Sequence, residues 1–271
     1  LLSAAHAADQ STEWWHYGRD AGGARFVSLQ QIDTTNVSRL ERAWTYRTGD
    51  IAGGGAHYAE CTPLVVDGTM YVITPFSRLI AINATTGQEL WRFSPEPPLS
   101  ERETGAGGLA SRGVTHWRDE DIERIFLPVR DGRIYSIDPA THRPDPDFGE
   151  DGRISLRQGL PKDGDYMFLT SPPSVLEDVL IQPYGIDDTS SEKNHYVPLR
   201  AYDARTGALR WTFHTIPRPG EFGHDTWAGD SWKDRSGTNP WTAISVDIER
   251  GIFYAAIGAP NSDKYGGDRH G

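Results

Sequence analysis

The stretch Asp67-Gly68-Thr69-Met70-Tyr71-Val72-Ile73, with Leu79-Ile80-Ala81-Ile82-Asn83, Ala84-Thr85-Thr86-Gly87 and Leu90-Trp91-Arg92-Phe93 after it, decides the fold. Short runs rich in Val, Ile, Tyr and Trp, separated by Gly, Asp and Asn, predict strands joined by tight turns. In such a turn, Asp or Asn bonds to its own backbone and Gly supplies a positive φ. We therefore expect three successive strands between residues 67 and 93.

The same pattern returns twice further along the chain. Its second copy comprises Arg124–Leu127, Gly132–Asp138 and the turn Pro139–His142, and its third comprises Val179–Ile181, Leu199–Asp203, Ala204–Gly207 and Leu209–Phe213. A spacing of roughly 55–65 residues without helical periodicity indicates the four-stranded blades of a β-propeller. The chain is therefore expected to be all-β, with about four blades.

Trp44, Trp91 and Trp211 recur at the strand that follows the turn, and we expect them to pack between neighbouring blades. The strand-like segment Gly251–Ile257 precedes a polar, Gly-rich stretch, residues 261–271. An open half-ring would leave an unpaired blade at its end. We therefore expect residues 9–271 to be the N-terminal part of a single propeller domain that continues beyond Gly271.

Composition excludes several classes of function. The formal net charge of −11 argues against recognition of a nucleic-acid backbone, which requires a basic face. The sequence contains no run of 18 apolar residues and therefore predicts no transmembrane helix. Cys61 is the single cysteine, so neither an intrachain disulfide nor a CxxCH haem site can form, and we expect a buried strand residue there.

The first eight residues, Leu-Leu-Ser-Ala-Ala-His-Ala-Ala, resemble the end of a signal peptide. Cleavage is expected after Ala7 or Ala8, because small residues in an Ala-x-Ala pattern form the cleavage site. Residues 1–8 are therefore interpreted as a signal-peptide remnant, which predicts a periplasmic or secreted protein. The alternative is an Ala-rich terminus without a targeting role.

Candidate functional residues occupy loops that enter or leave the innermost strands, where a propeller gathers function around its central channel. They are Glu60, Arg112, Thr170, the pair Asp187-Asp188, and Trp241. Taken singly, a loop Arg is usually a solvated charge and a loop Asp pair is usually a turn. Together, one Arg, carboxylates, a hydroxyl and a Trp could hold a flat polyanion on a cation.

The chain resembles the N-terminal half of dehydrogenases that depend on pyrroloquinoline quinone (PQQ), nearest to the membrane glucose dehydrogenase type and its soluble periplasmic relatives. The resemblance runs from about Trp14 to the end of the chain, and it implies an eight-bladed propeller with PQQ in the central channel. The matching segments are Tyr17–Asp20, Arg25-Phe26, Leu29–Ile32, Asn36–Leu40, Ala43-Trp44, Arg47–Asp50, Thr62–Leu64, Arg112–Val114, Leu127–Val129, Asp131–Arg133, Thr170–Pro173 and Tyr265–Gly267.

The resemblance also implies roles for individual residues. Glu60 takes the place of the acidic residue near the quinone, and Arg112 that of the guanidinium that pairs with PQQ. Thr170 resembles the hydroxyl donor to a PQQ carboxylate, and Asp188 the carboxylate that ligates Ca²⁺. Trp241 resembles the indole that forms the floor under the PQQ ring, and its alternative is a buried tryptophan between blades.

Two departures from the family pattern matter. Alcohol dehydrogenases of the family cover the other PQQ face with a disulfide between adjacent cysteines. This sequence has Ala106-Gly107-Gly108 there, so the bare backbone of Gly107 and Gly108 is expected over the ring, which argues against the methanol dehydrogenase branch. The family's Asn ligand to calcium falls at Ala259, which leaves Asn261 as a weak candidate for the metal. His224 and Asp225 are expected either at the channel entrance or on a surface loop.

The resemblance implies oxidation of an aldose or alcohol by hydride transfer to PQQ, with Ca²⁺ as Lewis acid and a quinone or cytochrome as electron acceptor. The family's general base lies in the second half, so no catalytic residue is assigned and the chain alone is expected to be inactive. One alternative is a non-catalytic propeller that scaffolds envelope proteins. Another is a propeller hydrolase or lyase, which the nine scattered His do not favour.

Overall fold

The computed structural model describes residues 13–50, 59–98, 110–160, 166–186, 196–233, 235–261 and 265–267. The expected signal-peptide remnant, residues 1–8, lies outside these ranges. The described chain is nearly all-β, with two short 3₁₀ helices at Val37–Arg39 (η2) and His224–Thr226 (η4). None of its described helices is long and apolar enough to cross a membrane.

The strands alternate with tight turns along the whole chain. Their bounds are β1 Leu64–Val66, β2 Thr69–Ile73, β3 Leu79–Asn83, β4 Glu89–Phe93, β5 Thr115–Asp119, β6 Ile122–Pro128, β7 Arg133–Asp138, β8 Arg143–Pro144, β9 Arg153–Ser155, β10 Met167–Phe168, β11 Ser174–Leu176, β12 Val179–Ile181, β13 Gly185–Ile186, β14 Leu199–Asp203, β15 Leu209–Phe213, β16 Ser245–Asp247 and β17 Ile252–Tyr254.

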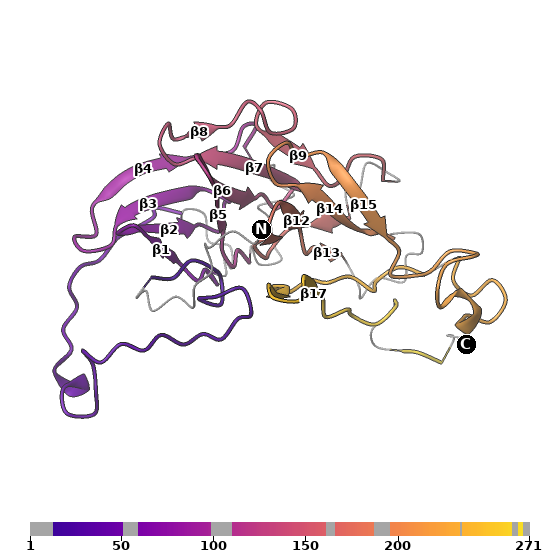
Figure 1. Ribbon diagram of the computed structural model, residues 1–271, viewed down its shortest axis with the longest axis horizontal. Helices are drawn as coiled ribbons and strands as arrows, with labels where there is room; N and C mark the ends of the chain where they lie inside the picture. Colours follow the sequence, from indigo (N-terminus) through magenta and orange to yellow (C-terminus); the bar gives the residue numbers. More distant parts are fainter. Residues whose placement is uncertain are drawn as a thin grey trace.

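The strands form blade-like antiparallel sheets in chain order. The first sheet has the order β1-β2-β3-β4, the second β5-β6-β7-β8 with β9 also on β7, and the third β11-β12-β14-β15. The pair β16-β17 begins a fourth, and β10 pairs with β13. Figure 1 shows the first three sheets following one another along an arc, from purple through magenta to orange. The predicted propeller blades are therefore confirmed.

The central strands of the second sheet have two apolar faces, because each face packs against a different neighbouring sheet. On β6, Ile125 and Leu127 belong to the core shared with the first sheet, whereas Phe126 belongs to the core shared with the third. On β7, Tyr135 faces the first sheet and Ile134 the third. Strands buried on both faces give continuous apolar runs rather than alternating patterns. This explains the run Arg-Ile-Phe-Leu at 124–127.

The tight turn after the third strand recurs with the same hydrogen bonds. Asn83 Oδ1 accepts from the backbone nitrogens of Thr85 (3.0 Å) and Thr86 (2.9 Å), and Gly87 has a φ of 72°. Asp203 and Gly207 repeat this arrangement, with a φ of 72° at the glycine. Glycine adopts a positive φ with less strain than other residues, and this turn sets the direction of the strand that follows.

Two of the recurring tryptophans, Trp44 and Trp91, pack against turns of this kind. A Cβ on Gly87 would be 2.5 Å from the Trp44 ring, and Trp44 Nε1 donates to Ala84 O at 3.2 Å. Trp91 in β4 stacks on His142, which occupies the glycine position of the second blade's turn, with ring centroids 4.9 Å apart. The predicted contact between blades is thus observed for Trp91.

The prediction of a packed Trp211 is wrong for the described part of the chain. Trp211 is 41% exposed, and its neighbours on the same strand, Leu209 and Phe213, are 55% and 59% exposed. The contact made by Trp91 explains the difference, because that ring is covered by the turn of the following blade. Among the described residues, the fourth sheet comprises only β16 and β17, and no corresponding turn reaches Trp211.

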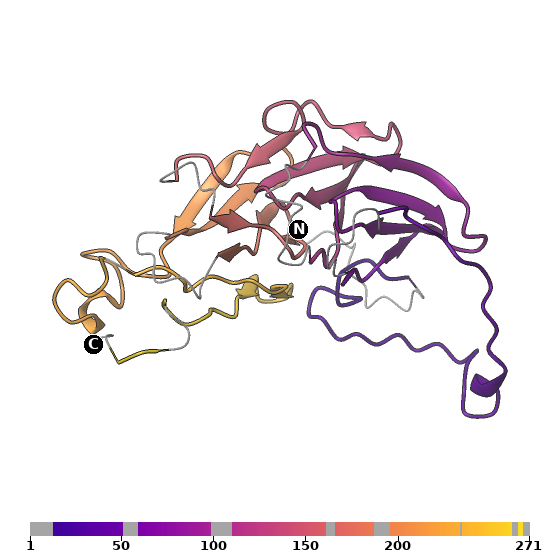
Figure 2. The same ribbon diagram turned by 180° about the vertical axis from the view of Figure 1, so that it is seen from behind.

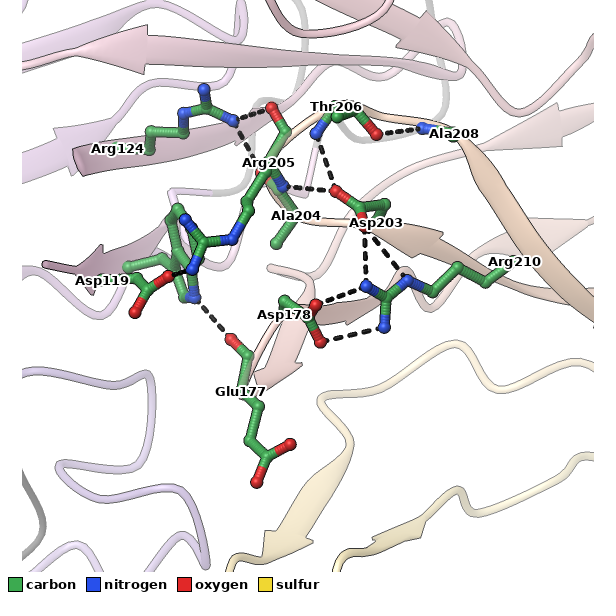
Figure 3. Close-up of polar contacts among 11 residues, drawn as sticks. Asp119, Arg124, Glu177, Asp178, Asp203, Ala204, Arg205, Thr206, Ala208 and Arg210 are labelled. Atoms are coloured by element: carbon green, nitrogen blue, oxygen red, sulfur yellow. Dashed lines mark hydrogen bonds and ion pairs between the residues drawn. The ribbon is translucent and has the colours of Figure 1, made fainter. Parts of the chain in front are cut away.

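A polar clamp joins the second and third sheets (Figure 3). Arg124 is 2% exposed and donates to Ala204 O at 2.8 Å and to Arg205 O, while its other nitrogen pairs with Asp145. These contacts satisfy two turn carbonyls of the third sheet. A buried charge of this kind is tolerated because it is both paired and hydrogen-bonded.

Aromatic contacts extend the clamp toward the surface. The guanidinium carbons of Arg124 and Arg205 lie 5.8 and 5.7 Å from the centroid of the Trp117 ring, within cation–π range. Trp117 Nε1 donates to Glu177 O at 2.6 Å, and Arg205 pairs with Asp119. The second and third sheets are therefore held together by charge and hydrogen bonding as well as by apolar packing.

The N-terminal segment crosses between the first and last sheets. Trp14 and Val65 exchange two backbone bonds of 3.0 Å, and Val246 N donates to Ala21 O at 2.8 Å. Beyond Arg25, the chain leaves the sheets as the extended arm at the lower right of Figure 2. The segment thus links β1 to β16 before the first blade begins.

The prediction of a buried strand residue at Cys61 is wrong. Cys61 lies before β1, outside any strand, and is only half-buried. Its side chain packs against the core between the first and second sheets. Burial raises the pKa of the thiol to about 11. The ordinary pKa of a cysteine thiol is about 8.5. The protonated thiol therefore stabilises the folded state fully below that pH, and this contribution is lost as the pH rises to about 11.

Replacing Arg124 with Met in the full natural gene product is expected to lower the free energy of unfolding by about 3–5 kcal/mol, because Asp145 loses its buried partner. Arg250→Met is the control, since Arg250 pairs with Asp247 at an exposed site and should cost under about 1 kcal/mol. Urea unfolding measures both. Equal losses for the two variants would contradict a stabilising clamp.

Alkylation of Cys61 by iodoacetamide at pH 8 should be roughly 100-fold slower in the folded protein than in urea, because the raised pKa leaves little thiolate. Mass spectrometry of the Cys61 peptide measures both rates. Comparable rates in the two states would show that the thiol is accessible and its pKa ordinary.

Candidate functional site

Four segments that lead into the first strands of successive sheets meet at one place. Glu60, Arg112, Thr170 and Trp241 stand three or four residues before β1, β5, β11 and β16, respectively. The first strand of each blade lies nearest the propeller axis. Residues at this position in neighbouring blades are therefore brought side by side, although they are 52 to 71 positions apart in the chain.

Backbone hydrogen bonds join these lead-in segments from blade to blade. Thr62 N donates to Arg112 O at 2.8 Å, and Arg112 N donates to Thr170 O at 2.8 Å. Ala59 and Ser111 form a further parallel bridge. Arg112 thus holds the segments on both sides of it, and its own backbone is fixed by both.

The Arg112 side chain contacts the other three predicted residues. Its Nη2 lies 3.0 Å from Glu60 Oε2, and its Nη1 donates to Thr170 Oγ1 at 2.7 Å. Its guanidinium carbon lies 5.4 Å from the centroid of the Trp241 ring. The planar fork of an arginine suits such simultaneous contacts, which a lysine cannot make. The structure therefore brings Glu60, Arg112, Thr170 and Trp241 into one cluster.

The cluster is open on one side. The Glu60 side chain is 41% exposed and Trp241 is 50% exposed, whereas the Arg112 side chain is 18% exposed and Thr170 is 8% exposed. A half-exposed indole beside a guanidinium offers a flat apolar face next to a cation. Among the described residues, Trp241 is not buried between blades, which was its alternative position.

Two buried residues behind the cluster escaped the sequence interpretation. Ser171 Oγ donates to Trp241 O at 2.9 Å, and Gln182 Nε2 donates to Ser171 O at 2.8 Å and to Pro183 O at 2.6 Å. Ser171 stands in the segment Thr170–Pro173 that resembles the family, but the sequence gives it no role. Gln182 follows a strand and carries no sequence signal of its function.

The fourth lead-in segment is also fixed by the loop that follows β12. Tyr184 N donates to Pro240 O at 2.8 Å, and Asn239 Nδ2 donates to Tyr184 O at 2.7 Å. Burial raises the pKa of Tyr184, and its hydroxyl donates to Val197 O. The residues before Trp241 are therefore anchored to the third blade.

A cavity of about 150 Å³ lies next to the cluster, between the N-terminal segment and the first strands of the later sheets. Pro172 and Pro173, which follow the Thr170 segment, form part of its wall, and Asp20 and Arg25 contribute polar groups. A Cβ on Gly113 would be 3.4 Å from the Tyr17 ring, so the N-terminal segment packs closely under the Arg112 segment.

The other predicted site residues are not in this cluster or cannot be placed. Gly107, Gly108 and Asp188 lie outside the described residues. Asn261 is 7% exposed, and its backbone bonds to Ser236 O and to Arg235 Nη1 in the fourth sheet's segment. In the described part of the chain, no three His, Cys, Asp or Glu side chains lie close enough to hold a metal ion.

His224 and Asp225 belong to the short helix η4 in the loop between β15 and β16. His224 is half-exposed, and its Nδ1 lies 3.1 Å from Pro217 O, while Asp225 is exposed. Both residues therefore occupy a surface loop, one of the two expected positions.

Comparison with known proteins supports the same family along the whole chain. The family described as PQQ glucose/ethanol/alcohol dehydrogenase, β-propeller domain, matches residues 14–271. Quinate/shikimate dehydrogenase (quinone) of Acinetobacter baylyi is 32% identical over 97% of this chain and 34% of its own length. Quinoprotein glucose dehydrogenase A of Acinetobacter calcoaceticus is 30% identical over 95% of this chain and 34% of its own length.

A solved structure supports the fold. The quinohemoprotein alcohol dehydrogenase from Comamonas testosteroni superposes with a TM-score of 0.74 at 24% identity, over 97% of this chain and 38% of that one. The chain spans about a third of the length of the curated relatives it matches. The match to the family over residues 14–271 shows that the chain belongs to the β-propeller family of PQQ-dependent glucose, ethanol and alcohol dehydrogenases.

Proposed function

We propose that the cluster of Glu60, Arg112, Thr170 and Trp241 forms part of a PQQ site in a dehydrogenase that oxidises a sugar or an alcohol. One observation carries the proposal: three residues from three other blades, Glu60, Thr170 and Trp241, converge on the guanidinium of Arg112. A non-catalytic scaffold propeller would need the blade repeats but would not need this convergence.

The groups present fit a flat, tricarboxylated quinone. Arg112 would pair with a carboxylate or quinone oxygen through its planar fork. Thr170 Oγ1, which accepts from Arg112 at 2.7 Å, keeps its own proton for donation to a carboxylate. The exposed face of Trp241 would support the ring by stacking, and the backbone of Gly107 and Gly108 would cover the opposite face.

Glu60 would both orient Arg112 and face the ligand. Its carboxylate lies 3.0 Å from Arg112 and is partly exposed, so it can orient the guanidinium while an oxygen remains available to a ligand or a proton. Asp188 and Asn261 would supply oxygen ligands to Ca²⁺, which prefers carboxylate and amide oxygens. No catalytic base is assigned.

PQQ, when bound, supplies an electrophilic quinone carbonyl that accepts hydride from the CH–OH carbon of the substrate. The contribution of this chain is to bind, orient and partly enclose the cofactor. Sugars, alcohols or hydroxy acids are the proposed substrates, and a quinone or cytochrome is the proposed acceptor. We also propose a periplasmic or secreted location, which the resemblance of residues 1–8 to the end of a signal peptide supports.

Reconstitution of the full natural gene product tests this function. The apoprotein should oxidise members of a panel of aldoses, alcohols and quinate with an artificial dye only after PQQ is added, and chelation of Ca²⁺ should abolish turnover. The preferred substrate would identify the branch of the family. A folded protein that neither binds PQQ nor turns over any substrate would support the scaffold alternative instead.

A further inference from the structure

The connection between the third and fourth lead-in segments differs from the others in kind. The first three segments are joined by backbone bonds that involve Arg112 itself. In the described residues, the backbone bond nearest Trp241 reaches Pro240 O instead. The bond to Trp241 comes from a side chain, the Ser171 hydroxyl, at 2.9 Å.

Ser171 connects Trp241 to the Arg112 and Thr170 side of the cluster. It is fully buried, follows Thr170 directly and lies 3.5 Å from Arg112 Nη1, measured to its Oγ. A hydroxyl has one proton and two lone pairs, so donation to Trp241 O leaves an acceptor site for the guanidinium. The position of one small side chain therefore relates the backbone of Trp241 to Arg112.

Gln182 braces this serine from behind. It is 1% exposed, and its amide nitrogen donates to Ser171 O at 2.8 Å and to Pro183 O at 2.6 Å. Because both carbonyls belong to different segments, the amide fixes the lead-in of the third blade to the end of β12. The two amide protons of Gln182 thus tie the backbone of Ser171 to that of Pro183.

We infer that Ser171, braced by Gln182, is a positioning residue that holds Trp241 at its distance from Arg112 and Thr170. The expected effect on PQQ binding rests on the proposed function. The position of Trp241 relative to Arg112 does not depend on that function. Without the hydroxyl, the bond to Trp241 O is lost and the half-exposed indole is free to move away from the guanidinium.

The chain offers a matched control. Ser174 Oγ donates to Ile244 O at 2.6 Å, three residues further along the same two segments and across the same separation of 70 positions. Ser174→Ala removes the same kind of bond between the same blades. It leaves the Arg112 contact untouched.

The test uses the full natural gene product labelled with 5-fluorotryptophan. The ¹⁹F resonance of Trp241, assigned with Trp241→Phe, should shift or broaden in Ser171→Ala and stay unchanged in Ser174→Ala. The PQQ dissociation constant, measured by calorimetry, should rise about tenfold in Ser171→Ala, as expected for loss of one buried hydrogen bond. Ser174→Ala should change it less than about twofold.

Gln182→Leu provides a second variant, with a smaller effect in the same direction on both readouts. An unchanged Trp241 resonance in Ser171→Ala, or equal effects of the two serine variants, would overturn the inference. A wild-type protein that does not bind PQQ would instead overturn the proposed function. The fluorine signal would then still decide the role of Ser171.

Discussion

The second sheet buries both of its faces, and the arrangement of the neighbouring sheets follows from this. Ile125 and Leu127 face one neighbour while Phe126 faces the other, so the second sheet is stable only between two others. Sheets packed in this way follow one another along an arc (Figure 1). The buried Arg124 clamp then fixes the spacing of the second and third sheets at their turns.

The site is a consequence of this arrangement. Once the first strands are parallel neighbours, the residues just before them form a row around the axis, and Arg112 can reach Glu60, Thr170 and Trp241 at once. Each of these four residues comes from a different blade. Distribution over four blades also means that the cluster's geometry depends on bonds between blades, which is why the Ser171 hydroxyl acquires a role there.

The third strands of the blades and the residues of the cluster could be predicted from the sequence. The turn motif located the third strands correctly, because Gly87 and Gly207 require a positive φ and Asn83 and Asp203 bond to their own turns. The residues before the first strands could be compared because they recur once per repeat. The structure brings four of them, Glu60, Arg112, Thr170 and Trp241, into contact, and their roles toward a cofactor remain proposals.

Other features were beyond sequence reasoning for physical reasons. Ser171 and Gln182 act through contacts between segments that no periodicity reveals. Trp211 is exposed, because its cover would have to come from a following turn that the described residues do not include. Cys61 lies three residues before β1, since the strand begins only when pairing with β2 becomes possible at Leu64. His142 shows that a turn can retain its shape with a φ of 63° at a non-glycine residue.

The most direct measurement is a cryo-electron-microscopy or crystal structure of the full natural gene product with PQQ. We expect cofactor density over the Trp241 ring, with a carboxylate or quinone oxygen within hydrogen-bonding distance of Arg112 and Thr170. Density elsewhere in the propeller, or an Arg112–Glu60–Thr170 cluster that makes no contact with the bound cofactor, would contradict it.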